Sequence, residues 1–267
     1  MNIAVLLWSI LSDITELDMA RPRHLSRAPI VEAVVDVRAK TRAGFKPDTL
    51  LEVHGQLLPA YQHKEEMNHL EFGFFQAAGK PPEQHVKDLG NLGYRFITSD
   101  RLQIVQFRTD GFSFSRLAPY TRWEELFEEA SRLWAIYEKA APLEEATRLA
   151  VRYINRLPLP ANKVQDFSPF LTAPPPVPKE LNVLLRHFLT RVTVREPASP
   201  IDAHIVQAIQ PAPSEEVISV ILDIDVFETG AFAPSGEVIL PRFAALREVK
   251  NRLFFASLTE QAVALFE

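Results

Sequence analysis

Arginine residues recur at strand-like spacing in two apolar segments, and they are the strongest candidates for chemistry in this sequence. In the segment 148–157 (RLAVRYINRL) three arginines are four residues apart, and the segment 189–195 (LTRVTVR) repeats that spacing. Even spacing along a β-strand places residues on one face. Guanidinium groups bind carboxylates and phosphates through two parallel hydrogen bonds. We therefore predict a basic stripe that binds an anionic ligand or an acidic partner, formed by Arg116, Arg148, Arg152, Arg156, Arg191 and Arg195.

An alternative interpretation assigns these arginines to cross-strand ion pairs within the protein. The chain holds 34 acidic and 29 basic residues, so there are enough carboxylates to pair every arginine. The acidic candidates lie on predicted strands, at Glu32, Asp36, Asp223 and Asp225. Asp223 and Asp225 are two residues apart, as in a catalytic pair, but this spacing is more typical of the solvent face of a strand.

A second function hypothesis is an enzyme with a non-standard active site in a pocket between two halves of the chain. Its site would draw on arginine, tyrosine, amide and acid–base groups from several strands. The residues are Arg116, Tyr120, Arg152, Asn155 and either Asp202 or His204. In the binding hypothesis, Tyr153 and Asn155 support the arginines from the opposite face of their strand.

The residue types that common catalytic and metal sites require are scarce. The chain has no cysteine and nine glycines, and it contains no glycine-rich phosphate loop and no nucleophile elbow. None of its seven histidines has the spacing of a zinc-binding pair. The sequence therefore predicts no cofactor and no metal site, and it leaves open whether the protein is an enzyme.

Charge and composition favour a cytoplasmic protein that binds neither nucleic acid nor membrane. The net charge is −5 and the pI about 5.9, whereas nucleic-acid binding needs a basic surplus. Nucleic-acid binding through the sheet stays a third hypothesis, although alternating strand aromatics such as Phe107 and Phe112 are more typical of a core than of base-stacking platforms. The absence of cysteine fits a reducing compartment. The sequence does not predict the oligomeric state.

Residues 1–24 read as an N-terminal extension. Residues 3–11 are apolar but too few to span a bilayer, and no positive region precedes them. Three interpretations fit this segment: a helix that packs on the core, a segment that contacts a membrane, or translation from a start codon upstream of Met19. We favour the last.

The first half of the remaining chain predicts a strand, a helix, four strands and a long helix. Asp110-Gly111 predicts a hairpin, so the last three strands should form an antiparallel meander. Thr121 and Glu124 have the spacing of a capping box, and Pro142 should end the long helix. The predicted strands are 30–39, 70–76, 94–98, 102–108 and 112–117, and the first helix lies between Pro47 and Pro59.

The second half predicts a similar order of elements. A strand at 148–157 is followed by helical signals in 162–171 and 178–188, by strands at 189–195, 204–210 and 217–227, and by a long helix that Pro241 opens. We therefore predict an α+β fold in which two pseudo-repeated β-α-β(3–4)-α halves, 25–145 and 146–267, join antiparallel sheets into one continuous curved sheet with helices on one face. This order resembles the duplicated fold of the TATA-box-binding protein. The alternative is an unrelated α+β fold.

Three blocks also resemble a sporadically distributed, uncharacterised bacterial protein family. They are APIVEAVVDVR (28–38), FSFSRLAPYTRWEELFEEASRLWAIY (112–137) and RYINRLPLP (152–160). The resemblance runs from about residue 25 to the C-terminus and implies no activity, substrate or site residue. The function we predict is therefore an intracellular binding or interaction module that uses the arginine-bearing sheet face.

Overall fold

A computed structural model describes residues 19–75, 83–160, 167–176, 185–211 and 216–267, with backbone alone at 69–75 and 83–89. The predicted extension at residues 1–18 lies outside this part of the chain. The described residues 19–24 are tied to the C-terminal segment: Met19 bridges Thr259, and Arg23 forms ion pairs with Glu260 and Glu267. No helix in the described ranges combines the length and the apolar character that crossing a membrane requires.

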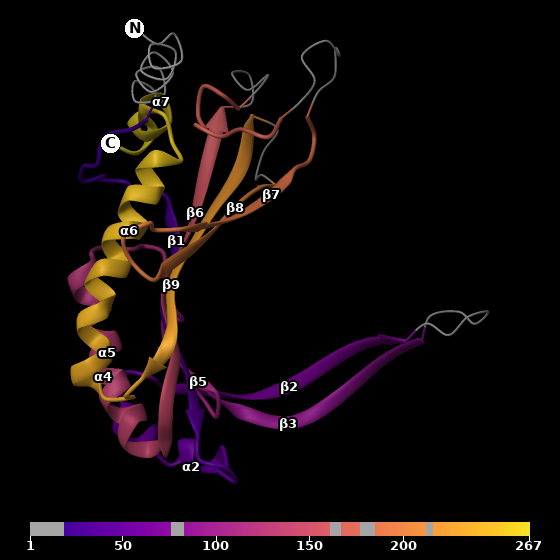
Figure 1. The fold of residues 1–267 in the computed structure, drawn as a ribbon, viewed down its shortest axis with the longest axis vertical. Helices are drawn as coiled ribbons and strands as arrows, with labels where there is room; N and C mark the ends of the chain where they lie inside the picture. The colour runs from indigo at the N-terminus through magenta and orange to yellow at the C-terminus, as the bar shows by residue number, and fades with distance from the viewer. Residues whose placement is uncertain (1–18, 76–82, 161–166, 177–184, 212–215) are drawn as a thin grey trace, which may run out of the picture. The chain divides into compact units, whose positions relative to one another are not determined.

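The described strands form one antiparallel sheet, which confirms the α+β class (Figure 1). Its nine strands follow the order β2-β3-β4-β5-β1-β6-β9-β8-β7. Their bounds are β1 Ile30–Thr41, β2 His63–Phe75, β3 Glu83–Ile97, β4 Gln103–Arg108, β5 Gly111–Leu117, β6 Leu143–Pro160, β7 Leu189–Arg195, β8 Ile201–Gln210 and β9 Val217–Phe232.

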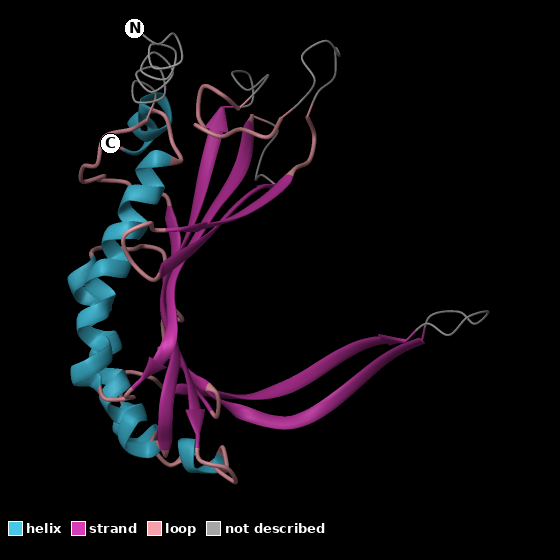
Figure 2. Ribbon diagram, in the orientation of Figure 1, coloured by secondary structure: helices cyan, strands magenta, loops and turns pink. Residues whose placement is uncertain are grey.

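Helices are few, and they lie on one side of the strands they pack against (Figure 2). Two of them are long enough to cover strands, α4 (Trp123–Ala140) and α6 (Phe243–Ala256). The others are single turns: α2 Asp48–Leu51, α3 His54–Leu57, α5 Gly236–Ile239 and α7 Glu260–Val263, with 3₁₀ turns η2 Leu240–Arg242 and η3 Ala264–Phe266.

Several predicted elements need correction. The helix expected between Pro47 and Pro59 is two separate turns, and β2 and β3 begin well before the segments predicted for them. Helix α4 starts from Arg122 without a side-chain cap, because the Thr121 hydroxyl donates instead to Glu125 Oε2 at 2.5 Å. The long final helix is interrupted: Pro241 lies in η2, and α6 ends at Ala256 before Thr259 caps α7.

The predicted repeat of element order stays a prediction. The described parts of the second-half helical segments, 167–171 and 185–188, contain no helix, and the rest of both segments lies outside the described residues. The chain instead divides into two compact units that are discontinuous in sequence. Unit 1 comprises residues 1–32, 151–228 and 244–267, and unit 2 comprises 33–150 and 229–243.

Unit 2 contains the predicted meander. Strands β3, β4 and β5 pair in antiparallel register, and the Asp110-Gly111 hairpin is present. Gly111 has φ 144°, and a Cβ there would lie 2.1 Å from the carbonyl oxygen of Val37, so only glycine lets the turn approach β1 this closely. Phe107 and Phe112 pack against Tyr137, and Phe112 also contacts Trp134, both on α4; this aromatic cluster is the core beneath the meander.

In unit 1, strands β7, β8 and β9 pair antiparallel in an uninterrupted register. Alternate residues of β9, among them Leu222, Ile224 and Val226, are completely buried. On β6, Tyr153 lies beneath α6, whose Lys250 Nζ is 3.9 Å from the centre of the tyrosine ring. Helix α6 therefore covers one face of β6, and the opposite face of β6 carries the residues between the buried positions.

Candidate functional site

The alternation predicted for β6 is confirmed. Arg152 and Arg156 are exposed, whereas their neighbours Tyr153 and Asn155 are each 1% exposed. Asn155 donates from its amide to the carbonyl oxygens of Leu222 and Tyr153. Tyr153 and Asn155 therefore lie on the face of β6 opposite the arginines, as expected, where both are enclosed in the core on the α6 side. Their support of the arginines in a partner contact stays a prediction.

The strand register brings four of the predicted arginines onto one face of unit 1. Arg152 contacts Asp223, which lies opposite Val206 on β8, and Val206 lies opposite Arg191 on β7. Directly opposite residues share a face of the sheet. We call this surface the arginine face, and its charged and polar members are Arg152, Arg156, Arg191, Thr193, Arg195, Asp202, His204, Asp223 and Asp225.

Two of these arginines are held by aspartates, as the ion-pair interpretation expected. Arg152 donates from Nε and Nη2 to the two Asp223 oxygens at 2.9 and 2.6 Å. Arg195 makes the same two-pronged contact with Asp202 at 2.8 and 2.7 Å. The hydrogen bonds that Arg152 donates to Asp223 raise the pKa of Arg152, and the hydrogen bonds that Asp202 accepts from Arg195 lower the pKa of Asp202. These pairs link neighbouring strands.

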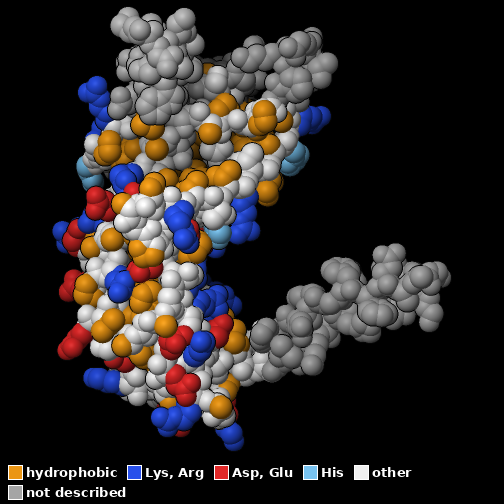
Figure 3. Space-filling model, viewed as in Figure 1, with side chains coloured by type: hydrophobic (Ala, Val, Ile, Leu, Met, Phe, Trp, Pro, Cys, Tyr) orange, Lys and Arg blue, Asp and Glu red, His pale blue; other side chains and the backbone are white. Residues whose placement is uncertain are grey.

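Arg156 and Arg191 differ from that pattern. Both side chains are exposed, and no carboxylate in the described part of the chain forms an ion pair with either guanidinium. The arginine face carries four arginines and three aspartates, and the negative charge of Glu32 on β1 also acts on Arg152. Figure 3 shows basic and hydrophobic side chains close together in the region of β7 and β8.

A histidine lies between the paired and unpaired arginines. His204 Nδ1 is 2.9 Å from the hydroxyl oxygen of Thr193 on β7, and its ring packs against Phe227 at 4.8 Å between centroids. Among the described residues, no three histidine, aspartate or glutamate side chains are grouped so that they could hold a metal ion.

The other two predicted arginines belong to unit 2, where both contact carboxylates. Arg116 Nη1 lies 3.5 Å from Glu125 Oε2, and Arg148 Nη1 lies 3.5 Å from Asp36 Oδ1. The six predicted residues thus divide between the two units, four in one and two in the other. The residues named for the enzyme hypothesis are also divided between the units. Unit 2 contains Arg116 and Tyr120, and unit 1 contains Arg152, Asn155, Asp202 and His204.

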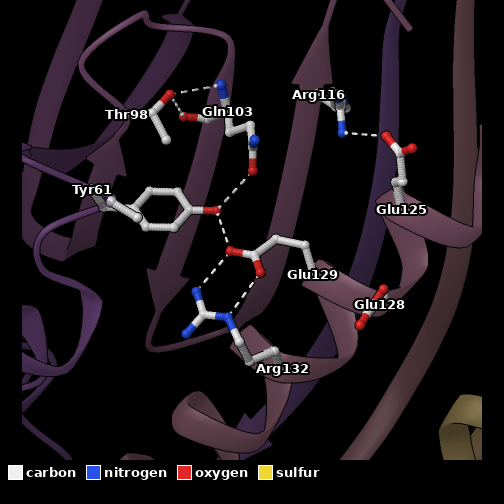
Figure 4. A pocket seen from close by; sticks show the side chains of 9 residues that line it. Tyr61, Thr98, Gln103, Arg116, Glu125, Glu128, Glu129 and Arg132 are labelled. Carbon is white, nitrogen blue, oxygen red and sulfur yellow. Dashed lines mark hydrogen bonds and ion pairs between the residues drawn. The ribbon is translucent and has the colours of Figure 1, made fainter. Parts of the chain in front are cut away.

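Unit 2 also has a pocket of about 390 Å³ between β4, β5 and α4 (Figure 4). Its centre is Tyr61, which is completely buried and donates to Glu129 Oε1 at 2.8 Å. Burial is the main cause of the raised pKa of Tyr61. The lining residues are Ala60, Tyr61, Thr98, Gln103, Arg116, Glu125, Glu128, Glu129 and Arg132.

Most polar groups of this pocket bind one another. Arg132 donates from Nε and Nη2 to both oxygens of Glu129 at 2.8 and 2.7 Å, so the charge near Tyr61 is neutralised. A phenol with a raised pKa stays protonated and is a poor base near neutral pH. These hydrogen bonds form a structural network that joins α4 to the loop between α3 and β2, which contains Tyr61.

One unusual residue was missed by the sequence reasoning, the buried Lys250. It is 9% exposed, and burial, together with the positive charge of Arg247, lowers its pKa to about 7. The signal was present in the sequence, because Lys250 lies four residues after Leu246 and seven after Phe243, on the apolar stripe of α6. A lysine at such a position is either buried or interrupts the stripe.

Comparison with known proteins adds no relative: no family model, no curated protein and no solved structure matches this chain. The resemblances to the uncharacterised bacterial family and to the TATA-box-binding-protein element order stay predictions.

Proposed function

We propose that the protein is a binding module that holds an acidic protein segment on the arginine face of unit 1. The observation that carries the proposal is that Arg156 and Arg191 are exposed and form no ion pair with a carboxylate of the described chain, next to two arginines that aspartates already orient. A guanidinium that is not neutralised within the chain can make a charge-assisted hydrogen bond to a ligand carboxylate. The lack of cysteine supports a cytoplasmic setting.

The fixed pairs support the same function in a second way. Because Asp223 and Asp202 hold Arg152 and Arg195 in place, these side chains lose little conformational freedom when a ligand arrives. Each guanidinium has five N–H donors, of which the aspartate uses two. Ligand carboxylates can therefore bind across the row without breaking the existing pairs.

A direct test is fluorescence anisotropy with a labelled peptide of alternating glutamate and valine residues. We expect binding that weakens as salt is raised, and we expect Arg156→Glu/Arg191→Glu to weaken it by about tenfold or more, since hydrogen bonds to charged groups contribute about 1.5–3 kcal/mol each. The matched control is Arg42→Glu/Lys46→Glu, which makes the same charge change in an exposed loop of unit 2. Equal affinity of the wild type and the face variant would refute the proposal.

Two further probes separate acidic protein from other anions. The same peptide with lysine in place of glutamate should not bind. Single-stranded DNA should bind more weakly than the acidic peptide at every salt concentration; tighter binding to DNA would instead favour nucleic acid as the ligand.

A further inference from the structure

Strand β7 lies at one end of the sheet order, and no described strand pairs with its outer side. It is exposed along almost its full length: Leu189, Val192 and Val194 are 72%, 51% and 38% exposed. Natural edge strands are commonly protected by proline, lysine or a bulge. Residues 189–195 contain neither proline nor lysine, and the register with β8 is continuous.

The hydrogen bonds at both ends of β7 determine which of its backbone groups face outward. Glu196 donates from its backbone N–H to Ile201, and the carbonyl oxygen of Phe188 accepts from Ile209. On the β7 side these bonds come from Phe188 and Glu196, which are both even-numbered. In an antiparallel pair, the residues that bond to a given neighbour alternate along the strand. The even-numbered residues of β7 therefore bond to β8, and the odd-numbered residues direct their N–H and C=O groups to the outer edge.

The outward backbone groups belong to the residues whose side chains lie on the arginine face. Leu189, Arg191, Thr193 and Arg195 are the odd-numbered residues, and they share a face with His204 and Asp223. An added strand would form its backbone pairs directly opposite these residues, with Cα atoms about 5.5 Å apart. A carboxylate at such a position of the added strand would lie beside Arg191 or Arg195.

We infer that β7 binds an extended acidic segment of a partner protein by strand addition, with acidic residues opposite Arg191 and Arg195 and apolar residues opposite Val192 and Val194. The inference rests on the proposed function and specifies its partner. The charges argue against a second copy of this chain as the occupant: antiparallel self-pairing centred on Thr193 places Arg191 opposite the partner's Arg195, and like charges directly opposite each other destabilise a sheet.

Thr193→Pro tests the strand addition directly. The substitution removes one outward N–H donor but no donor to β8, and proline is tolerated at such edge positions. We expect the glutamate–valine peptide to bind at least about tenfold more weakly to this variant. Thr193→Val is the matched control: it also loses the hydroxyl that contacts His204 but keeps the N–H, so its affinity should stay within about twofold of the wild type.

A second measurement modifies the peptide ligand instead of the protein. The same peptide with N-methyl groups on alternate residues keeps its charges but loses its backbone donors on one side, and it should bind the wild-type protein at least about tenfold more weakly in one of the two methylation frames. This arm gives an answer even if Thr193→Pro does not fold, which circular dichroism would show.

The outcomes separate this inference from the proposed function. If Thr193→Pro and both methylated peptides bind normally while Arg156→Glu/Arg191→Glu binds weakly, the face holds an acidic ligand without strand addition, and the inference fails alone. If the face variant also binds normally, the proposed function fails as well. A dimer in sedimentation that the peptide dissociates would make a second copy the occupant and overturn the inference.

Discussion

Among the described residues, each compact unit buries one basic side chain, and the surroundings of these two side chains differ. In unit 2 the side chain of Arg108 is 7% exposed and donates to Asp36 at 3.1 Å, Asp110 at 3.0 Å and Gln106 at 3.2 Å. In unit 1 Lys250 is almost as buried, but within the described chain no carboxylate forms an ion pair with it, and its ammonium group lies over the Tyr153 ring.

The difference shows where the protein uses its carboxylates. In unit 2, the single carboxylate of Asp36 forms ion pairs with Arg38, Arg108 and Arg148, and so it links β1 to β4 and β6. In unit 1, Lys250, Arg156 and Arg191 form no ion pair with any carboxylate of the described residues. A buried charge without a partner costs free energy, whereas an exposed one costs little and remains available to a ligand. Stability should therefore depend on the carboxylates of unit 2, and binding on the arginines of unit 1 that lack them.

The largest effect should come from removing the acceptor of the buried arginine. We expect Asp36→Ala to lower the free energy of unfolding by about 3–5 kcal/mol, because it leaves Arg108 buried with an incomplete set of partners. Urea unfolding followed by tryptophan fluorescence measures this. Glu145→Ala is the control, since it breaks the 2.9 Å pair with the exposed Lys40 and should cost less than about 1 kcal/mol. Equal losses would mean that burial does not set the strength of these pairs.

The next largest effect should come from Lys250, whose replacement should raise the free energy of unfolding, whereas the replacement of Asp36 should lower it. Its pKa is lowered to about 7 in the folded protein, so between pH 7 and the ordinary lysine pKa the unfolded chain binds more protons than the folded one. Stability should therefore rise with pH across this interval, by about 3 kcal/mol between pH 7 and pH 10.

Lys250→Met tests that assignment. Methionine keeps an unbranched apolar chain at this position, so the variant should be more stable than the wild type at pH 7 and should lose most of the rise towards pH 10. Urea unfolding at pH 6, 7, 8, 9 and 10 provides the comparison. A variant with the same pH dependence as the wild type would show that other groups cause it.

How much of the fold the sequence determines depends on whether the signal is local. The bounds of β7 follow from the alternation of LTRVTVR, and the β4–β5 hairpin follows from Asp110-Gly111. The early parts of β2 and β3, by contrast, were not predicted, and residues such as Lys64 and Glu65 carry no strand pattern of their own. The two strands pair antiparallel over 12 positions, so the early part of each lies opposite the late part of the other. Long-range pairing made those segments strands, and it could not be read from one segment alone.

The candidate site shows the same limit. Alternation correctly placed Arg152 and Arg156 opposite Tyr153, because side-chain direction is local to a strand. It could not place β7 at the end of the sheet, where two strands separate it from β6, or select Asp202 as the partner of Arg195, since both depend on strand order. Nor could it show that the Asn155 amide bonds to the backbone of β9, because that contact joins distant segments.

The smallest effects should come from the exposed pairs of the arginine face, and they complete the comparison with Arg108. Arg152 has the same two-pronged geometry towards a carboxylate, but its side chain is 48% exposed, so water and salt screen the pair. We expect Arg152→Ala to cost about 1 kcal/mol in urea unfolding, with a smaller loss in high salt. The Arg195 side chain is 66% exposed, so Arg195→Ala should change the midpoint of urea unfolding less than Arg152→Ala does. If instead either change destabilises the protein as much as Asp36→Ala, these arginines are part of the fold rather than of a surface left free for a partner.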